Sequence, residues 1–302
     1  MNLKHLAIFR AVAQTGSVSG GAARLFISQS AVSKQLADFE AALGLPLFDR
    51  LPRGVRLTQA GRVLLGHANR LFAVEAQASR ALADLKGLAS GNIAIGASRT
   101  IGSYLLPQRL ANFHSAYPGI ALQLRVDNSQ IVEQLLVDGE IDLAFTEGPG
   151  QHEQLQYRAF MQDALVLIAN PDHAYAHAGE IRLKQLTQVP ILMHEPGSGT
   201  RDVTEKQLMA KGVQVRPVMT LASTEAIKQT VAAGAGLAFI SALSIDQELR
   251  NRTLKVVRIK QFSITRPLYQ VRLKSLAPSP ANKAFLTLFS AQDDQTVAAL
   301  HR

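Results

Sequence analysis

The sequence predicts an α+β segment at the N-terminus, one long helix after it, and an α/β module over the rest of the chain. In the first 87 residues, apolar side chains recur at steps of three and four, the spacing of one helix face. A turn signal at Pro52-Arg53-Gly54 interrupts them and indicates a short hairpin. From residue 93 onward, short apolar runs alternate with helical segments, which is typical of a mainly parallel sheet covered by helices. The expected boundaries are 1–58, 59–89 and 90–302.

The composition is that of a folded protein with two or three domains. Of the 302 residues, 47% are hydrophobic and 18% are charged, which is ordinary for a chain that buries a core. There is no Cys, which excludes disulfides, thiolate metal sites and cysteine nucleophiles and suits a reducing cytoplasm. Lys4, His5 and Arg10 interrupt the first apolar stretch, so we expect no signal peptide. The longest uncharged run, 229–245, contains polar residues and glycines and is not expected to span a membrane.

The net charge of +9 is concentrated near the N-terminus. Residues 1–65 contain eight Lys or Arg and three Asp or Glu, so they carry +5 of that charge. A basic first fifth is typical of a nucleic-acid-binding segment, although a solvated basic surface is a common alternative.

Three helices are expected before the hairpin. The first spans residues 3–15, and the second follows Ser17, whose hydroxyl is a good N-cap. Phe26 is expected to turn inward after the second helix. The third helix begins after Ser28 and places one apolar face inward, formed by Val32, Leu36, Phe39 and Leu43.

The outer face of the third helix carries donors and few acids, in the form of Gln29, Ser30, Ser33 and Lys34. Amide and hydroxyl groups at the N-terminal end of a helix suit contact with base edges in a DNA groove. A helical hairpin within a small bundle is the alternative. The hairpin that follows, 47–50 and 55–57, carries Arg50 on one flank and Arg53 at its tip, where guanidinium groups can reach phosphates or the minor groove. Three helices and a hairpin in this order predict a winged helix-turn-helix that binds DNA.

The long helix, expected over 58–87, has an apolar repeat of three and four residues. This repeat suggests a coiled-coil seam, whose members are Leu64, Ala68, Leu71, Glu75, Ala78, Leu82 and Leu85. Packing of the helix on its own domain is the alternative. Self-association is favoured, because no second long amphipathic helix lies nearby to pair with it.

The α/β module is expected to form two lobes with separate sheets. The first lobe comprises 90–162 and 268–302, and the second comprises 163–267. Two crossings, near 160–163 and 264–268, would form the hinge.

Three turns after predicted strands combine hydroxyl, amide and glycine groups: Ser98-Arg99-Thr100, Asn128-Ser129-Gln130, and the segment 194–201 with the sequence HEPGSGTR. Ligands of open α/β sheets bind beyond the carboxyl ends of the strands, where helix N-termini point. The turns therefore predict a small-anion site between the lobes, with simple N-capping as the alternative for each turn. GSGTR lacks the Lys and the spacing of a phosphate-binding P-loop.

Catalytic and metal sites are not expected. His194 and Glu195 are adjacent, and His173 and His177 fall in a predicted loop, so each is interpreted as an isolated side chain. No cofactor is expected.

Residues 1–66 resemble the DNA-binding domain of the LysR-type transcriptional regulators. The residues that carry this resemblance are Phe9, Val12, Gly16, Ser17, Ala22-Ala23, Leu25, Ser28 to Ser33, Leu36, Glu40, Leu43-Gly44, Leu47-Phe48, Arg50, Arg53 and Leu57 to Gly61. Ser30, where many members have Pro, and Phe39, where Leu is usual, depart from the pattern. The resemblance implies that Gln29, Ser30, Ser33 and Lys34 face the major groove and that Arg53 makes the wing contact. With Ser17, Ser28 and Arg50, these residues form the expected DNA-binding set.

The resemblance extends more weakly over the rest of the chain. It implies a two-lobed effector-binding domain similar to periplasmic solute-binding proteins, and an assembly that is usually tetrameric. The wording TIGSYLLP (100–107) and EPGSGTR (195–201) is similar to a subgroup that includes regulators of sulfur metabolism. His194, where Arg is frequent, and Asp127, beside Asn128, depart from that subgroup. The expected effector is a sulfur oxyanion or a carboxylate, bound by Ser98, Thr100, Ile101, Asn128, Ser129, Glu195, Gly197, Thr200 and Arg201. A structural role is the alternative for Arg201.

The sequence therefore predicts a regulator that binds double-stranded promoter DNA as a dimer or tetramer under the control of a small anion. RNA polymerase is a further expected partner. A solute-binding module without a role at DNA is the alternative class, and an enzyme comes third.

Overall fold

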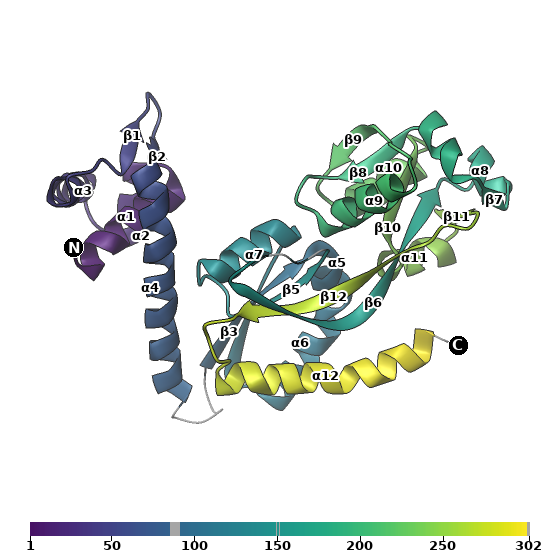
Figure 1. The fold of residues 1–302 in the computed structure, drawn as a ribbon. Coiled ribbons are helices and arrows are strands. Elements are labelled where there is room, and N and C mark those ends of the chain that lie inside the picture. Colours follow the sequence, from purple (N-terminus) through teal and green to yellow (C-terminus); the bar gives the residue numbers. More distant parts are fainter. Residues whose placement is uncertain (85–90, 149, 151, 301–302) are drawn as a thin grey trace. The chain divides into compact units, whose positions relative to one another are not determined.

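The computed structural model describes residues 1–84, 91–148, 150 and 152–300. Contacts divide the chain into two compact units, 1–79 and 80–302 (Figure 1). Across the described ranges, no helix is both long and apolar enough to pass through a lipid bilayer. The predicted fold class is confirmed.

The first unit contains three helices, a hairpin and most of a long helix. The elements are α1 (Leu3–Thr15), α2 (Val18–Leu25), α3 (Gln29–Leu43), β1 (Phe48–Arg50), β2 (Val55–Leu57) and α4 (Gln59–Asp84). The first three helices begin at side-chain caps: Asn2, Ser17 and Ser28 accept bonds from first-turn amides. Their inward stripes meet in one core that includes Phe9, Val12, Val32, Phe39 and Leu47.

Backbone contacts fix the hairpin against the helices. Val55 N donates to Gly16 O at 2.9 Å, and the carboxylate of Glu40 accepts from Leu47 N at 2.6 Å. Gly54 has φ +87°, and a Cβ there would lie 2.5 Å from Gly16 O, so only glycine fits this close approach. The hairpin is therefore held in one position relative to α3.

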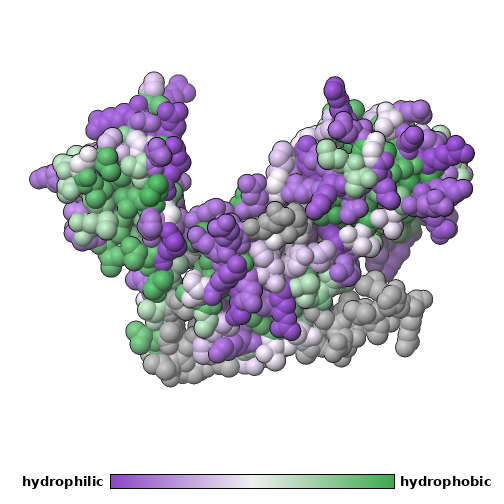
Figure 2. Space-filling view, in the orientation of Figure 1, coloured by the Kyte–Doolittle hydropathy of each residue, from purple (hydrophilic) through white to green (hydrophobic). Residues whose placement is uncertain are grey.

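Only some of the residues predicted to form a seam along α4 are free to contact another chain. Ala68 is fully buried and Leu64 packs beside it in the core of the first unit, so that part of the seam prediction is wrong. These turns of α4 pack on the core of their own domain, as the alternative expected. Further along, Leu71 and Leu82 are exposed, and Figure 2 shows apolar side chains at the surface of this unit. Leu85 lies outside the described residues.

The second unit is built on one twisted sheet. Its elements are β3 (Gly91–Ser98), α5 (Arg99–Tyr104), α6 (Leu106–Ala116), β4 (Ile120–Asp127), α7 (Ser129–Val137), β5 (Leu143–Glu147), β6 (Leu155–Ala169), α8 (Ala174–His177), β7 (Glu180–Ile181), η1 (Leu183–Gln188), β8 (Ile191–His194), α9 (Gly199–Ala210), β9 (Pro217–Leu221), α10 (Thr224–Ala232), β10 (Leu237–Ser241), η2 (Ala242–Ser244), α11 (Asp246–Arg250), β11 (Lys255–Ile259), β12 (Ile264–Leu273) and α12 (Pro280–Leu300).

The two lobes share this sheet, which corrects the expectation of two separate sheets. The main strand order is β4-β3-β5-β12-β6-β10-β8-β9. The antiparallel strands β6 and β12 pair from Ile264 opposite Leu165 to Leu273 opposite Leu155, and they run from one lobe into the other (Figure 1). Lobe I holds the parallel strands β3, β4 and β5, and lobe II holds β8, β9 and β10. The two predicted crossings are therefore neighbouring segments of one ribbon.

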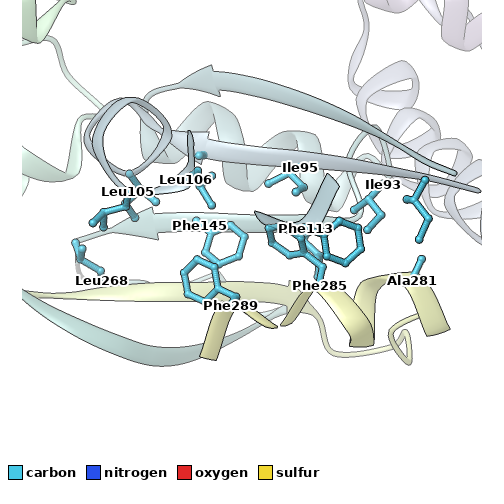
Figure 3. Packing of buried hydrophobic residues seen from close by; sticks show 14 residues of the cluster. Ile93, Ile95, Leu105, Leu106, Phe113, Phe145, Leu268, Ala281, Phe285 and Phe289 are labelled. Carbon is cyan, nitrogen blue, oxygen red and sulfur yellow. The ribbon is translucent and has the colours of Figure 1, made fainter. Parts of the chain in front are cut away.

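Each lobe has its own core beside the ribbon. In lobe I, aromatic side chains of α12 pack on the sheet, where Phe285 and Phe289 meet Phe113 and Phe145 (Figure 3). In lobe II, Leu208, Phe239 and Ile264 belong to a second cluster. The helices α5, α7 and α9 follow the carboxyl ends of β3, β4 and β8 in the chain, where the two lobes meet. The group of side-chain and backbone contacts between the lobes at these helix starts is called the cleft below.

Candidate functional site

The outer face of α3 is open, as its polar residues predicted. Gln29, Ser30, Ser33 and Lys34 are all exposed. Ser28 accepts from Ala31 N at 3.2 Å and contacts the Ser30 hydroxyl at 3.1 Å. Ser28 therefore organises the first turn of α3 and leaves the next side chains free to face a partner.

A groove of about 340 Å³ separates α3 from the hairpin. Its lining includes Ser17, Gln29, Ser33 and Arg50, so the structure brings four of the predicted DNA-binding residues to one hollow. Arg53 is exposed at the tip of the hairpin. Ser30, Lys34 and Arg53 do not line this groove.

Phe26 corrects the expectation that it turns inward. It ends α2 in a left-handed conformation with φ +55°, and its side chain is 94% exposed. Because Phe26 is left-handed, the backbone turns from α2 towards α3 at this residue, and the ring stays outside the core. Hydrophobicity alone could not indicate this, because the backbone conformation of the turn decides it.

In the second unit, Arg266 lies at the centre of the cleft. Its side chain is fully buried on β12, where Nη2 is 2.8 Å from the Asp163 carboxylate and Nη1 is 3.4 Å from that of Glu147. Nη1 also donates to Thr200 Oγ1 at 2.8 Å, and Nη2 donates to Thr100 Oγ1 at 3.4 Å. One guanidinium thus joins hydroxyl groups from the first turns of α5 in lobe I and α9 in lobe II.

Glu147, at the end of β5, completes this buried network. It accepts from the hydroxyls of Ser98 and Thr100, and its backbone oxygen accepts from Ser129 Oγ at 2.9 Å. Gly199 lies against the same carbonyl, and a Cβ there would come within 2.1 Å of it. The absence of a side chain at Gly199 allows α9 to approach lobe I.

A second group of contacts lies at the start of α7. Arg99 bonds to Asp127 at 2.9 Å within lobe I and to the Glu195 carboxylate of lobe II. Asn128 Nδ2 donates to the same Glu195 oxygen at 3.3 Å. Gln130 N donates to Gly197 O at 3.3 Å.

Most of the predicted effector residues therefore meet between the lobes: Ser98, Thr100, Asn128, Ser129, Glu195, Gly197 and Thr200. Two do not join them. Ile101 is fully buried in the hydrophobic core of lobe I, and Arg201 stays within lobe II, where it bonds to His194 O at 3.2 Å and to Glu205 at 2.8 Å.

The charges at the cleft are the feature that the sequence interpretation missed. Two arginines, Arg99 and Arg266, face four carboxylates, those of Asp127, Glu147, Asp163 and Glu195, so the formal charge of the cluster is −2. The sequence offered one signal for this charge cluster, namely a buried apolar strand that ends in Glu147. A buried carboxylate needs a cation or a hydrogen-bond donor beside it. Arg266 carried no comparable signal, since its strand partner is distant in the sequence.

His194 is held neutral beside this cluster. Burial, together with the cations Arg266 and Arg99, lowers the pKa of its imidazole to about 4. Within the described ranges, no group of three His, Asp or Glu side chains is arranged to hold a metal ion.

Comparison with known proteins agrees with both halves of this description. Residues 3–62 match the model described as "Bacterial regulatory helix-turn-helix protein, lysR family", and residues 86–294 match "LysR substrate binding domain". The chain is 32% identical over 292 residues to the HTH-type transcriptional activator CmpR of Synechocystis, a match that covers 97% of this chain and 96% of CmpR.

Solved structures extend the likeness to the fold. A full-length OxyR variant from Pseudomonas aeruginosa matches 97% of this chain and 94% of its own at a TM-score of 0.70 and 22% identity. The regulatory domain of Synechocystis CcmR, solved in complex with 2-PG, matches 67% of this chain and 97% of its own at a TM-score of 0.63 and 31% identity. With its helix-turn-helix, its two-lobed effector domain and these matches, the chain belongs to the LysR family of transcriptional regulators.

Proposed function

We propose that this regulator binds promoter DNA through α3 and the hairpin, and that a small anion bound between its lobes modulates this DNA binding. The observation that carries the proposal is the convergence of hydroxyl, amide and guanidinium donors from α5, α7, α9 and β12 at one cleft. Such donors suit a carboxylate, sulfate or phosphate group. The 2-PG bound by the CcmR domain supports an anionic effector for this chain as well.

The DNA-binding set comprises Ser17, Ser28, Gln29, Ser30, Ser33, Lys34, Arg50 and Arg53. Exposure of the α3 face supports direct contact of Gln29, Ser30, Ser33 and Lys34 with base edges or phosphates. Ser17 and Ser28 cap their helices, and they would act by orienting these helices at the DNA backbone. Arg50 and Arg53 supply positive charge on the hairpin side of the groove.

The active form is a homo-oligomer, in which α4 joins two chains into a dimer and two such dimers form a tetramer. Exposed apolar residues on the second half of α4 support this, since Leu71, Val74 and Leu82 recur at helical spacing on its surface. Two-fold symmetry would present two recognition helices to half-sites about one DNA turn apart. The protein would act in the cytoplasm by binding rather than catalysis, with RNA polymerase as the machinery it influences.

A thermal-shift screen tests the effector site. Wild-type protein is heated with sulfate, thiosulfate, phosphate, 2-PG and simple carboxylates, and at least one should raise the melting temperature, because a ligand that binds only the folded state stabilises it. Thr100→Val removes a hydroxyl that joins Arg266 and Glu147, so the ligand-induced rise should disappear.

The matched control is Thr253→Val, which changes an exposed threonine of lobe II and should keep the rise. Both variants should bind DNA as the wild type does. A rise that persists in Thr100→Val would contradict the assignment of this cleft as the effector site.

A further inference from the structure

Three donors of lobe I that suit an anion are already occupied by acceptors from lobe II. Arg99 Nη1 and Asn128 Nδ2 both donate to Glu195 Oε1. Gln130 N, an amide in the first turn of α7, donates to Gly197 O. A guanidinium, a side-chain amide and a helix N-terminal N–H are the groups that hold carboxylates and phosphates in other sites. The segment 195–197 therefore fills this set with its own carboxylate and carbonyl.

Glu195 is an imperfect occupant of this set. Its Oε2 is buried and has no hydrogen-bond partner among the described residues, which costs free energy because the oxygen has lost its water. Arg99 also shares its charge with Asp127, at 2.9 Å. A sulfate or phosphate group has enough oxygens to meet the guanidinium, the amide and the N–H together.

We propose that Glu195 is an internal competitor of the effector, and that Arg99 is the residue for which the two compete. The incoming anion takes Arg99 and Asn128 from the Glu195 carboxylate, the bond from Gln130 N to Gly197 O opens, and lobe II moves relative to lobe I. This rests on the proposed anionic effector and specifies how it acts. It reverses the role expected for Glu195, which opposes the effector rather than binding it.

The competition also sets the class of effector. An effector with a single carboxylate would only replace the Glu195 carboxylate by another of the same charge. It would gain little binding free energy, since Asp127 already neutralises part of the charge of Arg99. A tetrahedral oxyanion, such as sulfate or a phosphate monoester, has enough oxygens to accept from Arg99, Asn128 and Gln130 N together, which a single carboxylate does not. The cleft thus selects tetrahedral oxyanions over simple carboxylates.

The first experiment measures anion affinity by calorimetry in full-length wild type and Glu195→Gln, with sulfate, phosphate and 2-PG as probes. The variant keeps the shape of the side chain and removes its charge, so it should bind the best anion about tenfold more tightly. Glu205→Gln is the matched control, because Glu205 pairs with Arg201 inside lobe II, and its affinity should stay within about twofold of wild type. Arg99→Gln should lose most of the binding.

The second experiment needs no anion. Hydrogen exchange followed by mass spectrometry on peptides that cover 128–137 reports the bond from Gln130 N to Gly197 O. Exchange should be faster in Glu195→Gln than in wild type and unchanged in Glu205→Gln.

The outcomes separate the two proposals. Weaker or unchanged anion binding in Glu195→Gln, with normal binding in wild type, overturns the competition and leaves the effector site standing. Unchanged exchange in Glu195→Gln also overturns it. Failure of every anion to bind either protein overturns the anionic effector, and the competition with it.

Discussion

The outer face of α3 and the cleft between the lobes carry similar polar groups, but these are exposed on α3 and bonded to other protein groups in the cleft. On α3, Gln29, Ser33 and Lys34 are exposed. In the cleft, Arg99, Thr100 and Thr200 are partnered by other groups of the protein. The first surface meets a partner without giving up internal bonds. The second must exchange internal bonds for a ligand.

Only the surface whose donors are already bonded across the lobes can act as a switch. A ligand shifts a conformational equilibrium only by its differential affinity for the two states. In the cleft, Arg99 and Asn128 must release Glu195 of the other lobe before they bond to a ligand, so binding and lobe position are coupled. On α3, the same groups can bind without such coupling, which suits constant recognition of a DNA site.

Removal of the buried guanidinium at the centre of the cleft should have the largest effect. Arg266→Met leaves the carboxylates of Asp163 and Glu147 buried without their cation, so the free energy of unfolding of the second unit should fall by about 3–5 kcal/mol. Arg272→Met is the control, because that guanidinium bonds to Gln156 near the surface and should cost less than about 1 kcal/mol. Chemical denaturation measures both. Equal losses of unfolding free energy in the two variants would show that the buried Arg266 network contributes no more to stability than a surface arginine does.

The second test addresses the open surface. Ser33→Ala combined with Arg53→Ala should weaken binding to specific promoter DNA by about 10- to 100-fold and leave stability nearly unchanged, because neither side chain is buried. Fluorescence anisotropy over a range of salt concentrations should show a shallower dependence, since one phosphate contact is lost. Arg250→Ala removes an exposed charge from lobe II and should change neither quantity. Unchanged DNA affinity in the double variant would contradict the assignment of this face.

A smaller effect concerns pH. The pKa of His194 falls to about 4 in the folded cleft from about 6.5 in the unfolded chain. Between these values the unfolded state binds the additional proton, so stability falls as the pH drops below about 6.5 and continues to fall towards 4. The loss between pH 7.5 and pH 5 should be roughly 2 kcal/mol greater in wild type than in His194→Gln. A pH dependence of unfolding that is the same in both proteins would show that this imidazole is not held neutral by the cleft.

Periodicity and turn chemistry predicted the elements well because their causes are local. The caps at Ser17 and Ser28 and the inner stripe of Val32, Leu36 and Phe39 follow from neighbouring residues alone. The glycine and hydroxyl turns at Ser98, Asn128 and Thr200 likewise indicated where the strands end and helices begin. The exposed ring of Phe26 was missed, since a left-handed turn rather than hydrophobicity set its direction.

Local sequence was enough to predict the order of the elements, the open face of α3 and most of the residues of the cleft. The remaining features come from the tertiary structure. It packed Ala68 and Leu64 inside the first unit, joined both lobes by β6 and β12, and paired Arg99 with Glu195, 96 positions away in the chain. Local preferences act over a few residues, whereas the partner of a buried charge is chosen by where the folded sheet brings its strand ends together.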